Sequence, residues 1–236
     1  MTGTIINVIT VIIGSIAGVL FGAKLPERIR GAVLSVLGLF TLVLGVQMAL
    51  KTETPLIILA SLLFGTILGE WWRIEEGLET FGDRLKARFS QAFRGQDLSR
   101  FVEGFITASI LFCIGPMTIL GSIQDGLTGD YSLLATKAVM DGFAALAFAS
   151  TMGIGVIFST LIILAFQGGL SLLAIQVQGL ITPAMITEMS AAGGVILIGI
   201  AIGNILAIRK IRTGNFLPAL FLAPLLVALL EAVGAL

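Results

Sequence analysis

A lysine and an aspartate four residues apart are the residues of this sequence best suited to chemistry. Lys137 and Asp141 lie within the long apolar stretch 132–176, and this spacing puts them on one face of a helix. If that helix begins near Ser132, Asp141 is roughly 13 Å along it, close to the middle of a bilayer. The pair predicts either an ion pair that fixes packing or a site where a cation or proton binds. We favour the site, because ionisable groups at this depth are costly.

A second group of candidate residues surrounds a proline. Pro116 follows Gly115 in an apolar stretch, and its ring leaves the carbonyl of Phe112 without a helical partner. We therefore predict a helix break at Pro116, with free backbone groups near polar side chains, as in many ion and solute sites. The triplet Gln167-Gly168-Gly169 predicts another break. The candidate ion- or substrate-binding residues are Gln124, Asp125, Lys137, Asp141 and Gln167. The isolated Asn7 is assigned to contacts between helices.

Several kinds of chemistry are absent from the sequence. It contains no His and a single Cys, Cys113, which excludes histidine-based triads and zinc sites of the usual kind. There is no Walker or dinucleotide-binding glycine loop. We therefore predict that the protein is not an enzyme and binds no cofactor, and we leave open whether it binds a metal.

The composition predicts a membrane protein. Of 236 residues, 57% are hydrophobic and 12% are charged, against about 25% charged in a typical globular domain. The mean hydropathy is +1.07. These values predict one integral membrane domain over 1–236, an all-α bundle of transmembrane helices with broken helices, in contact with membrane lipids. The net charge of zero argues against nucleic acid as a partner.

About eight apolar segments are long enough to cross a bilayer. They lie near 4–22, 31–50, 55–72, 101–121, 132–150, 154–176, 184–207 and 216–235. The stretch 132–176 is too long for one span, and we divide it at Ser150-Thr151-Met152-Gly153.

Basic residues predict the orientation of these spans. With eight spans, 12 of the 14 Lys and Arg residues, Arg94 among them, fall in connections on one side. The positive-inside rule makes that side cytoplasmic. Both termini of this multi-pass protein are then expected outside.

The connection 73–100 is the only long polar segment. Its apolar residues Ile74, Leu78, Phe81, Leu85 and Phe89 recur at helical spacing, which predicts an amphipathic helix near 74–93. We expect it to lie along the cytoplasmic interface. The alternative is a solvated connector that docks this stripe on the bundle.

Small residues four apart form ridges in three spans. They are Gly14-x3-Gly18-x3-Gly22, Gly65-x3-Gly69 and Gly199-x3-Gly203, and such ridges allow two helices to approach closely. Packing within the chain is the favoured use of each, although one could support a homo-oligomer. Spans one and two also resemble spans seven and eight faintly, which allows internal repeats.

Several motifs together resemble a known family. They include Leu25-Pro26-Glu27-Arg28-Ile29-Arg30, the segment from Gly115 to Gly126, Lys137-Ala138-Val139-Met140-Asp141-Gly142-Phe143 and Asn215-Phe216-Leu217-Pro218-Ala219. The whole chain is similar to the family of domain of unknown function 554, the YdfK/YqgA-like prokaryotic membrane proteins. The resemblance implies a prokaryotic cytoplasmic membrane and a transporter-like fold, and no particular substrate.

We therefore expect a secondary transporter or channel for a small ion, either a cation or one coupled to protons, or for a small polar solute. Two acidic groups against one Lys favour a cation over a bare anion. The alternative is a non-transporting membrane scaffold or regulator that uses the 74–93 helix to contact partners.

Overall fold

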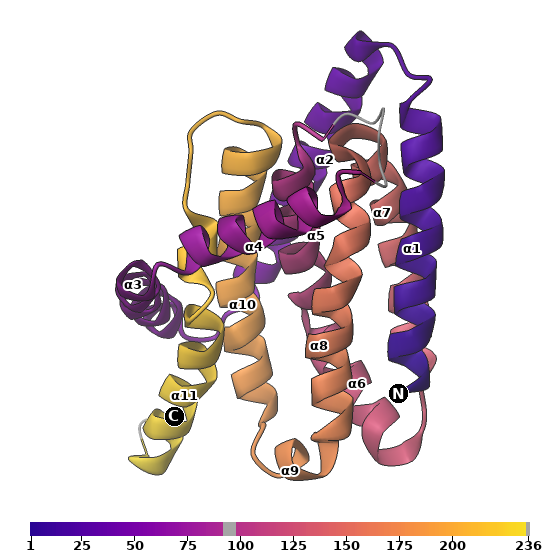
Figure 1. The fold of residues 1–236 in the computed structure, drawn as a ribbon. Helices are drawn as coiled ribbons and strands as arrows, with labels where there is room; N and C mark the ends of the chain where they lie inside the picture. The colour runs from indigo at the N-terminus through magenta and orange to yellow at the C-terminus, as the bar shows by residue number, and fades with distance from the viewer. Residues whose placement is uncertain (92–97, 235–236) are drawn as a thin grey trace. The chain divides into compact units, whose positions relative to one another are not determined.

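The computed structural model describes residues 1–91 and 98–234, and these residues form helices and turns without a β-strand (Figure 1). The first half contains α1 (Thr2–Gly22), α2 (Glu27–Ala49), α3 (Pro55–Trp72), α4 (Ile74–Phe89), α5 (Phe101–Cys113) and α6 (Pro116–Thr128). The second half contains α7 (Ser132–Met152), the 3-10 turn η1 (Gly153–Phe158), α8 (Ser159–Leu172), α9 (Ala174–Gln178) and α10 (Pro183–Ile200). It ends with the π-helical η2 (Ala201–Ile205), the 3-10 turn η3 (Thr213–Phe216) and α11 (Ala219–Ala232). The predicted all-α class is confirmed.

Helix contacts divide the chain into two compact units. Unit 1 comprises Met1–Leu37 and Glu79–Gln178, and unit 2 comprises Gly38–Leu78 and Gly179–Leu236. Every residue predicted for the site falls in unit 1. The two units are described separately below.

Within the described residues, six helical segments are long and apolar enough to cross a membrane, and the number is seven if the bent pair α5 and α6 forms one span. One of the six is the 41-residue segment Ser132–Leu172. It does not run straight, because Asn7 donates hydrogen bonds to both Asp141 and Gln167. A straight helix would hold those two residues roughly 39 Å apart. The segment therefore folds back on itself. Counting it as two passes gives seven spans, or eight if the bent pair α5 and α6 is also counted, and eight is the number expected from the sequence.

The reversal lies where the sequence predicted it. Helix α7 ends at Met152, and Gly153 has a φ of 80°, which a residue with a side chain rarely adopts. Next to it, Gly155 packs so tightly on the backbone of Phe101 that a Cβ would overlap the Phe101 carbonyl oxygen. Glycines thus allow the chain to turn and the turn to pack closely.

Helices α1 and α7 pack through the first glycine ridge. A Cβ at Gly14, Gly18 or Gly22 would overlap a backbone carbonyl oxygen of α7, at Gly142, Leu146 and Ser150 respectively. The successive contacts run in the same direction along both helices, so α1 and α7 are parallel. The ridge is therefore filled within the chain, as the sequence favoured. Whether the protein forms a homo-oligomer stays a prediction.

The predicted break at Pro116 is confirmed. Helix α5 ends at Cys113, α6 begins at Pro116, and their axes differ by 64°. Ile114 is extended and Gly115 has a φ of 140°, so two residues between the helices change the chain direction. Proline suits the first turn of the new helix, because an N–H at this position would have no acceptor within the helix and its absence therefore costs no hydrogen bond.

The second predicted break, at Gln167-Gly168-Gly169, is wrong. Helix α8 continues through all three residues to Leu172 (Figure 1). Glycine weakens a helix by roughly 1 kcal/mol relative to Ala, but unlike proline it keeps its N–H donor. Helical hydrogen bonds can therefore pass through Gly168 and Gly169.

The amphipathic segment forms the helix α4. Two phenylalanines of its apolar stripe contact other rings of unit 1, Phe81 with Phe105 at 5.8 Å and Phe89 with Phe158 at 5.1 Å between centroids. The docked stripe that the sequence left as the alternative is thus observed for these residues. Its position at a cytoplasmic interface stays a prediction. Residues 92–93 of the predicted helix, and Arg94 of the charge pattern, lie outside the described residues.

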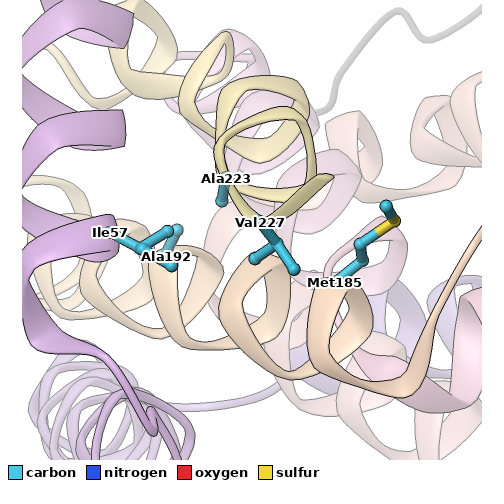
Figure 2. Close-up of a cluster of buried hydrophobic side chains, with 5 residues drawn as sticks. All are labelled: Ile57, Met185, Ala192, Ala223 and Val227. Atoms are coloured by element: carbon cyan, nitrogen blue, oxygen red, sulfur yellow. The ribbon is translucent and has the colours of Figure 1, made fainter. Parts of the chain in front are cut away.

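Unit 2 is built on α3, α10 and α11, whose side chains meet in a small apolar core. Figure 2 shows Ile57 of α3, Met185 and Ala192 of α10, and Ala223 and Val227 of α11 gathered there.

The other two glycine ridges also pack within unit 2. A Cβ at Gly65 would lie 2.6 Å from the backbone nitrogen of Ala219, and one at Gly69 would overlap the carbonyl oxygen of Asn215. A Cβ at Gly199 would lie 2.7 Å from the Cγ2 of Thr213. All three ridges are therefore used for packing between helices of the same chain.

Candidate functional site

The Lys137–Asp141 pair forms as the spacing predicts. Both side chains are buried on one face of α7, and the Lys137 ammonium donates a hydrogen bond to Asp141 Oδ2. A buried carboxylate and ammonium both lose their hydration, so each depends on the other for compensation. Asp141 lies near the middle of α7, far from both of its ends.

The lysine also satisfies the carbonyl that the helix break exposes. Lys137 Nζ donates to the Phe112 carbonyl oxygen at 2.8 Å, while the Thr118 hydroxyl donates more weakly at 3.4 Å. The sequence identified this carbonyl as unpaired but not its partner. The structure therefore joins the two predicted features, because the ammonium bridges the broken helix and the carboxylate.

Asn7 of α1 connects the pair to a third helix. Its Nδ2 donates to Asp141 Oδ2 at 3.0 Å and to Gln167 Oε1 at 3.3 Å. Asn7 and Gln167 are both fully buried. Gln167 thus belongs to the site, although it acts through Asn7 and not through a break in α8.

Asp125 lies about one helical turn away from this group along α1. Its Oδ2 accepts from the backbone N–H of Gly3 at 3.0 Å and from the ammonium of Met1 at 3.1 Å. Gly3 precedes Asn7 by four residues, or roughly 6 Å along the helix. The carboxylates of Asp125 on α6 and Asp141 on α7 therefore contact α1 at different levels along its axis.

Gln124 does not join the site. Its Nε2 donates to Asp130 Oδ2 at 2.8 Å, at the exposed turn between α6 and α7. The pKa of Asp130 is lowered, because the Ser132 backbone N–H donates to this carboxylate, with smaller contributions from the Ser132 and Gln124 side chains. Adjacent residues on a helix point about 100° apart, so Gln124 can reach the exposed turn while Asp125 is buried.

Asn7 is the residue that sequence reasoning undervalued. An amide in an otherwise apolar span was available as a signal. Nothing in the sequence, however, indicated that its contacts were Asp141 and Gln167, which are 134 and 160 residues away.

A separate surface groove contains none of the predicted site residues. It has a volume of about 730 Å³ and lies along the start of α2 beside Ala147. Its lining is apolar apart from Arg28. The buried polar network, and not this groove, is therefore the candidate site.

These features define a polytopic helical membrane protein with a polar interior. The outward face of α1 carries Ile5, Ile9, Ile13, Ile16 and Leu20, all exposed. Such a continuous apolar surface is suited to lipid and not to water. Buried charges are enclosed behind it in unit 1.

Comparison with known proteins identifies the family. The family described as "Protein of unknown function (DUF554)" matches residues 2–228, and the chain belongs to it. It is 30% identical to "Uncharacterized membrane protein YdfK" of Bacillus subtilis (strain 168), over 99% of each chain. It is 34% identical to "Uncharacterized protein YqgA" of Escherichia coli (strain K12), over 94% of each chain. No solved structure matches.

Proposed function

We propose that this protein is a secondary transporter or channel that moves a small cation, or a small solute coupled to protons, across a prokaryotic cytoplasmic membrane. The observation that carries the proposal is the buried network of Lys137, Asp141, Asn7 and Gln167 at the broken helix. Charged groups at such positions of membrane proteins commonly mark ion and proton pathways.

The helix break gives the lysine an alternative to the carboxylate. Lys137 Nζ holds both Asp141 Oδ2 and the Phe112 carbonyl oxygen. When a cation or a proton takes the charge of Asp141, the ammonium keeps the backbone carbonyl as a partner. The Lys137–Asp141 contact can therefore open without leaving the ammonium wholly unsatisfied, which would cost several kcal/mol.

Asn7 and Gln167 support such an exchange at the carboxylate. The Asn7 amide donates to Asp141 and so stabilises its charged form. Gln167 accepts from the same nitrogen and restrains the amide. Three helices, α1, α7 and α8, thus converge on one carboxylate, and a movement of any of them alters its environment.

The first prediction tests Asp141 in the purified protein, reconstituted in liposomes. Imposed Na⁺, K⁺ or pH gradients are followed with dyes for the ion and for internal pH. We expect a flux above that of protein-free liposomes for at least one gradient. Asp141→Asn should reduce it to the protein-free level, because the variant keeps the side-chain size but loses the charge and the titrating proton.

The matched control is Asp83→Asn, the same chemical change at an exposed position of α4. It should retain the wild-type flux. Equal flux in wild type and Asp141→Asn would contradict a transport role for the carboxylate. No flux in wild type under any gradient would instead favour the non-transporting scaffold. Against the scaffold, Phe81 and Phe89 of α4 already contact rings within unit 1, which leaves less of this helix available to a partner.

A further inference from the structure

Among the described residues of unit 1, eight side chains each hold a buried polar atom with no hydrogen-bond partner in the protein. Apart from Ser15 and Ser109, they belong to the first turns of α1 and to α6 and α8. The atoms of these six side chains are Thr4 Oγ1, Asn7 Oδ1, Ser122 Oγ, Asp125 Oδ1, Gln167 Nε2 and Ser171 Oγ. None of the six residues is more than 5% exposed. A buried polar group without a partner costs about 1–3 kcal/mol, so this concentration in one region calls for an explanation.

The six residues come in pairs from three helices. Thr4 and Asn7 are three apart on α1, Ser122 and Asp125 are three apart on α6, and Gln167 and Ser171 are four apart on α8. Each spacing places both members on one helix face. Helices α1, α6 and α8 pack against one another in unit 1.

Contacts between the helices set these residues at two levels. The Gly3 N–H donates to Asp125, and a Cβ on Gly126 would overlap the carbonyl oxygen of Ser171. Thr4, Asp125 and Ser171 therefore belong to the level at the start of α1.

The second level lies one turn further along α1. Asn7 contacts Gln167 there, and Ser122 lies one turn before Asp125 on α6. The polar faces of α1, α6 and α8 thus run side by side over two helical turns, with unpartnered polar atoms at both levels.

From this arrangement, we propose that Asp125, Thr4, Asn7, Ser122 and Ser171 form a binding site for a monovalent alkali cation, Na⁺ or K⁺. The five unpartnered atoms of these residues are oxygens, which hard cations prefer as ligands. Only Asp125 brings a formal negative charge. The sixth atom, Gln167 Nε2, is a donor and cannot ligate a cation, so Gln167 positions Asn7 through their hydrogen bond.

The ligand set favours a monovalent over a divalent or transition metal ion. No group of three or more His, Cys, Asp or Glu that could hold a metal ion occurs in the described part of the chain. The charge of Asp125 is also shared, because its Oδ2 pairs with the Met1 ammonium. With one shared charge, we expect weak binding, on the order of millimolar, since affinity follows the charge of the ligands.

The site extends the proposed transport function and rests on it for its biological role. Asn7 Oδ1 has no partner in the protein and is available to the proposed cation, whereas its Nδ2 donates to Asp141. In this proposal, Asn7 alone separates a cation bound near Asp125 from the carboxylate of Asp141, which takes part in transport. Asp125 would hold the ion at the end of unit 1, and Asp141 would receive it deeper in the bundle.

The second prediction measures cation binding without measuring transport. The thermal midpoint of the purified protein in detergent is measured as choline chloride is replaced stepwise by NaCl or KCl, so that the ionic strength stays constant. Because a ligand that binds only the native state stabilises it, Na⁺ or K⁺ should raise the midpoint with saturation, relative to choline. Thr4→Val and Ser122→Ala remove one oxygen each. Each should raise the cation concentration at half-saturation roughly tenfold, which corresponds to about 1.4 kcal/mol of binding free energy.

Matched controls use hydroxyls that are already satisfied. The Thr10 hydroxyl donates to backbone carbonyls of its own helix, and the Ser159 hydroxyl donates to Val156 at 2.7 Å. Thr10→Val and Ser159→Ala should therefore keep the wild-type cation response.

Two results would overturn the cation site. One is equal stabilisation by Na⁺, K⁺ and choline. The other is an unchanged alkali-cation response in both Thr4→Val and Ser122→Ala. Either result can occur while flux in liposomes is normal, and flux can be absent while cation binding is normal. The cation site and the transport function are therefore tested independently.

Discussion

Lys137 joins a carboxylate and a backbone carbonyl in the interior of unit 1. Its ammonium neutralises Asp141 and also occupies the carbonyl of Phe112, which the proline break leaves without a helical donor. Removing it leaves the charge of Asp141 without a counter-ion, with the Asn7 amide as the donor that remains, and leaves the Phe112 carbonyl with the weaker Thr118 hydroxyl. Loss of one partner of a buried ion pair typically costs about 3–5 kcal/mol.

The third prediction separates a structural from a functional role of this pair. Lys137→Met should lower the thermal midpoint of the purified protein strongly, because Asp141 becomes an uncompensated buried charge. The double variant Lys137→Met with Asp141→Asn should recover most of the stability, since no charge is then buried at either position.

Flux measured on the same variants completes this test. If the pair serves transport, the double variant should be stable and inactive. Recovery of both the midpoint and the flux in the double variant would show a structural pair only. Lys86→Met, at a half-buried position of α4 outside the site, serves as a control for the loss of a lysine.

At the scale of elements, the glycine ridge of α1 determines how closely two helices approach. Backbone contacts at Gly14, Gly18 and Gly22 bring α1 against α7 over most of its length. This approach also brings Asn7 within reach of Asp141. The ridge therefore positions the site as well as stabilising the bundle.

The fourth prediction follows from this close approach. Gly18→Ala places a methyl group against the Leu146 carbonyl oxygen and 2.9 Å from Ala149 Cβ. Since the backbone cannot move aside easily, we expect the free energy of unfolding to fall by about 1–3 kcal/mol or more. This should appear as a lower thermal midpoint and a lower yield of folded protein on size-exclusion chromatography.

The matched substitution is Gly31→Ala in α2, where a Cβ would meet no atom within 4 Å. It should be neutral or stabilising by up to about 1 kcal/mol, because alanine favours a helix over glycine. Similar midpoints for Gly18→Ala and wild type would contradict the tight packing of α1 on α7.

At the scale of the whole molecule, contacts within unit 1 show which segments share an end. Gly3 lies against Asp125, whereas Gly22 lies against Ser150 at the opposite end of α1. Phe101 lies against Gly155, near the end where Ser150 is found. The bent pair α5 and α6 therefore runs between the two ends of unit 1, as a broken span does.

The fifth prediction concerns the orientation of the chain in the membrane. Both termini should face outward, because eight passes place most basic residues on the opposite, cytoplasmic side. A reporter that is active only outside the cytoplasm should be active after Leu236, and also when inserted in the turn at Gly129.

The two fusion sites test different statements. The turn at Gly129 lies at the same end of unit 1 as Gly3, so it tests the orientation of that unit. A cytoplasmic reporter after Leu236, with an outward one at Gly129, would contradict the count of eight while leaving the path of unit 1 intact. Reporters inserted after Arg73 provide the cytoplasmic control.

Sequence alone determined the features that depend on neighbours along the chain. Apolar composition and periodicity predicted a helical membrane protein, Pro116 predicted the break, and the spacing of Lys137 and Asp141 predicted their contact. Each of these follows from local backbone chemistry, since a helix brings residues four apart together and a proline removes one hydrogen bond.

Only the tertiary structure decided which helix faces meet. The contact of Asn7 with Asp141, the bond from Lys137 to Phe112, and the turning of Gln124 away from the interior all depend on this. The rotation of each helix about its axis is set by packing against its neighbours, through glycine ridges and buried polar atoms. Asn7 and Asp141, 134 positions apart, therefore came together through the packing of whole helices, which the spacing of residues along the chain does not specify.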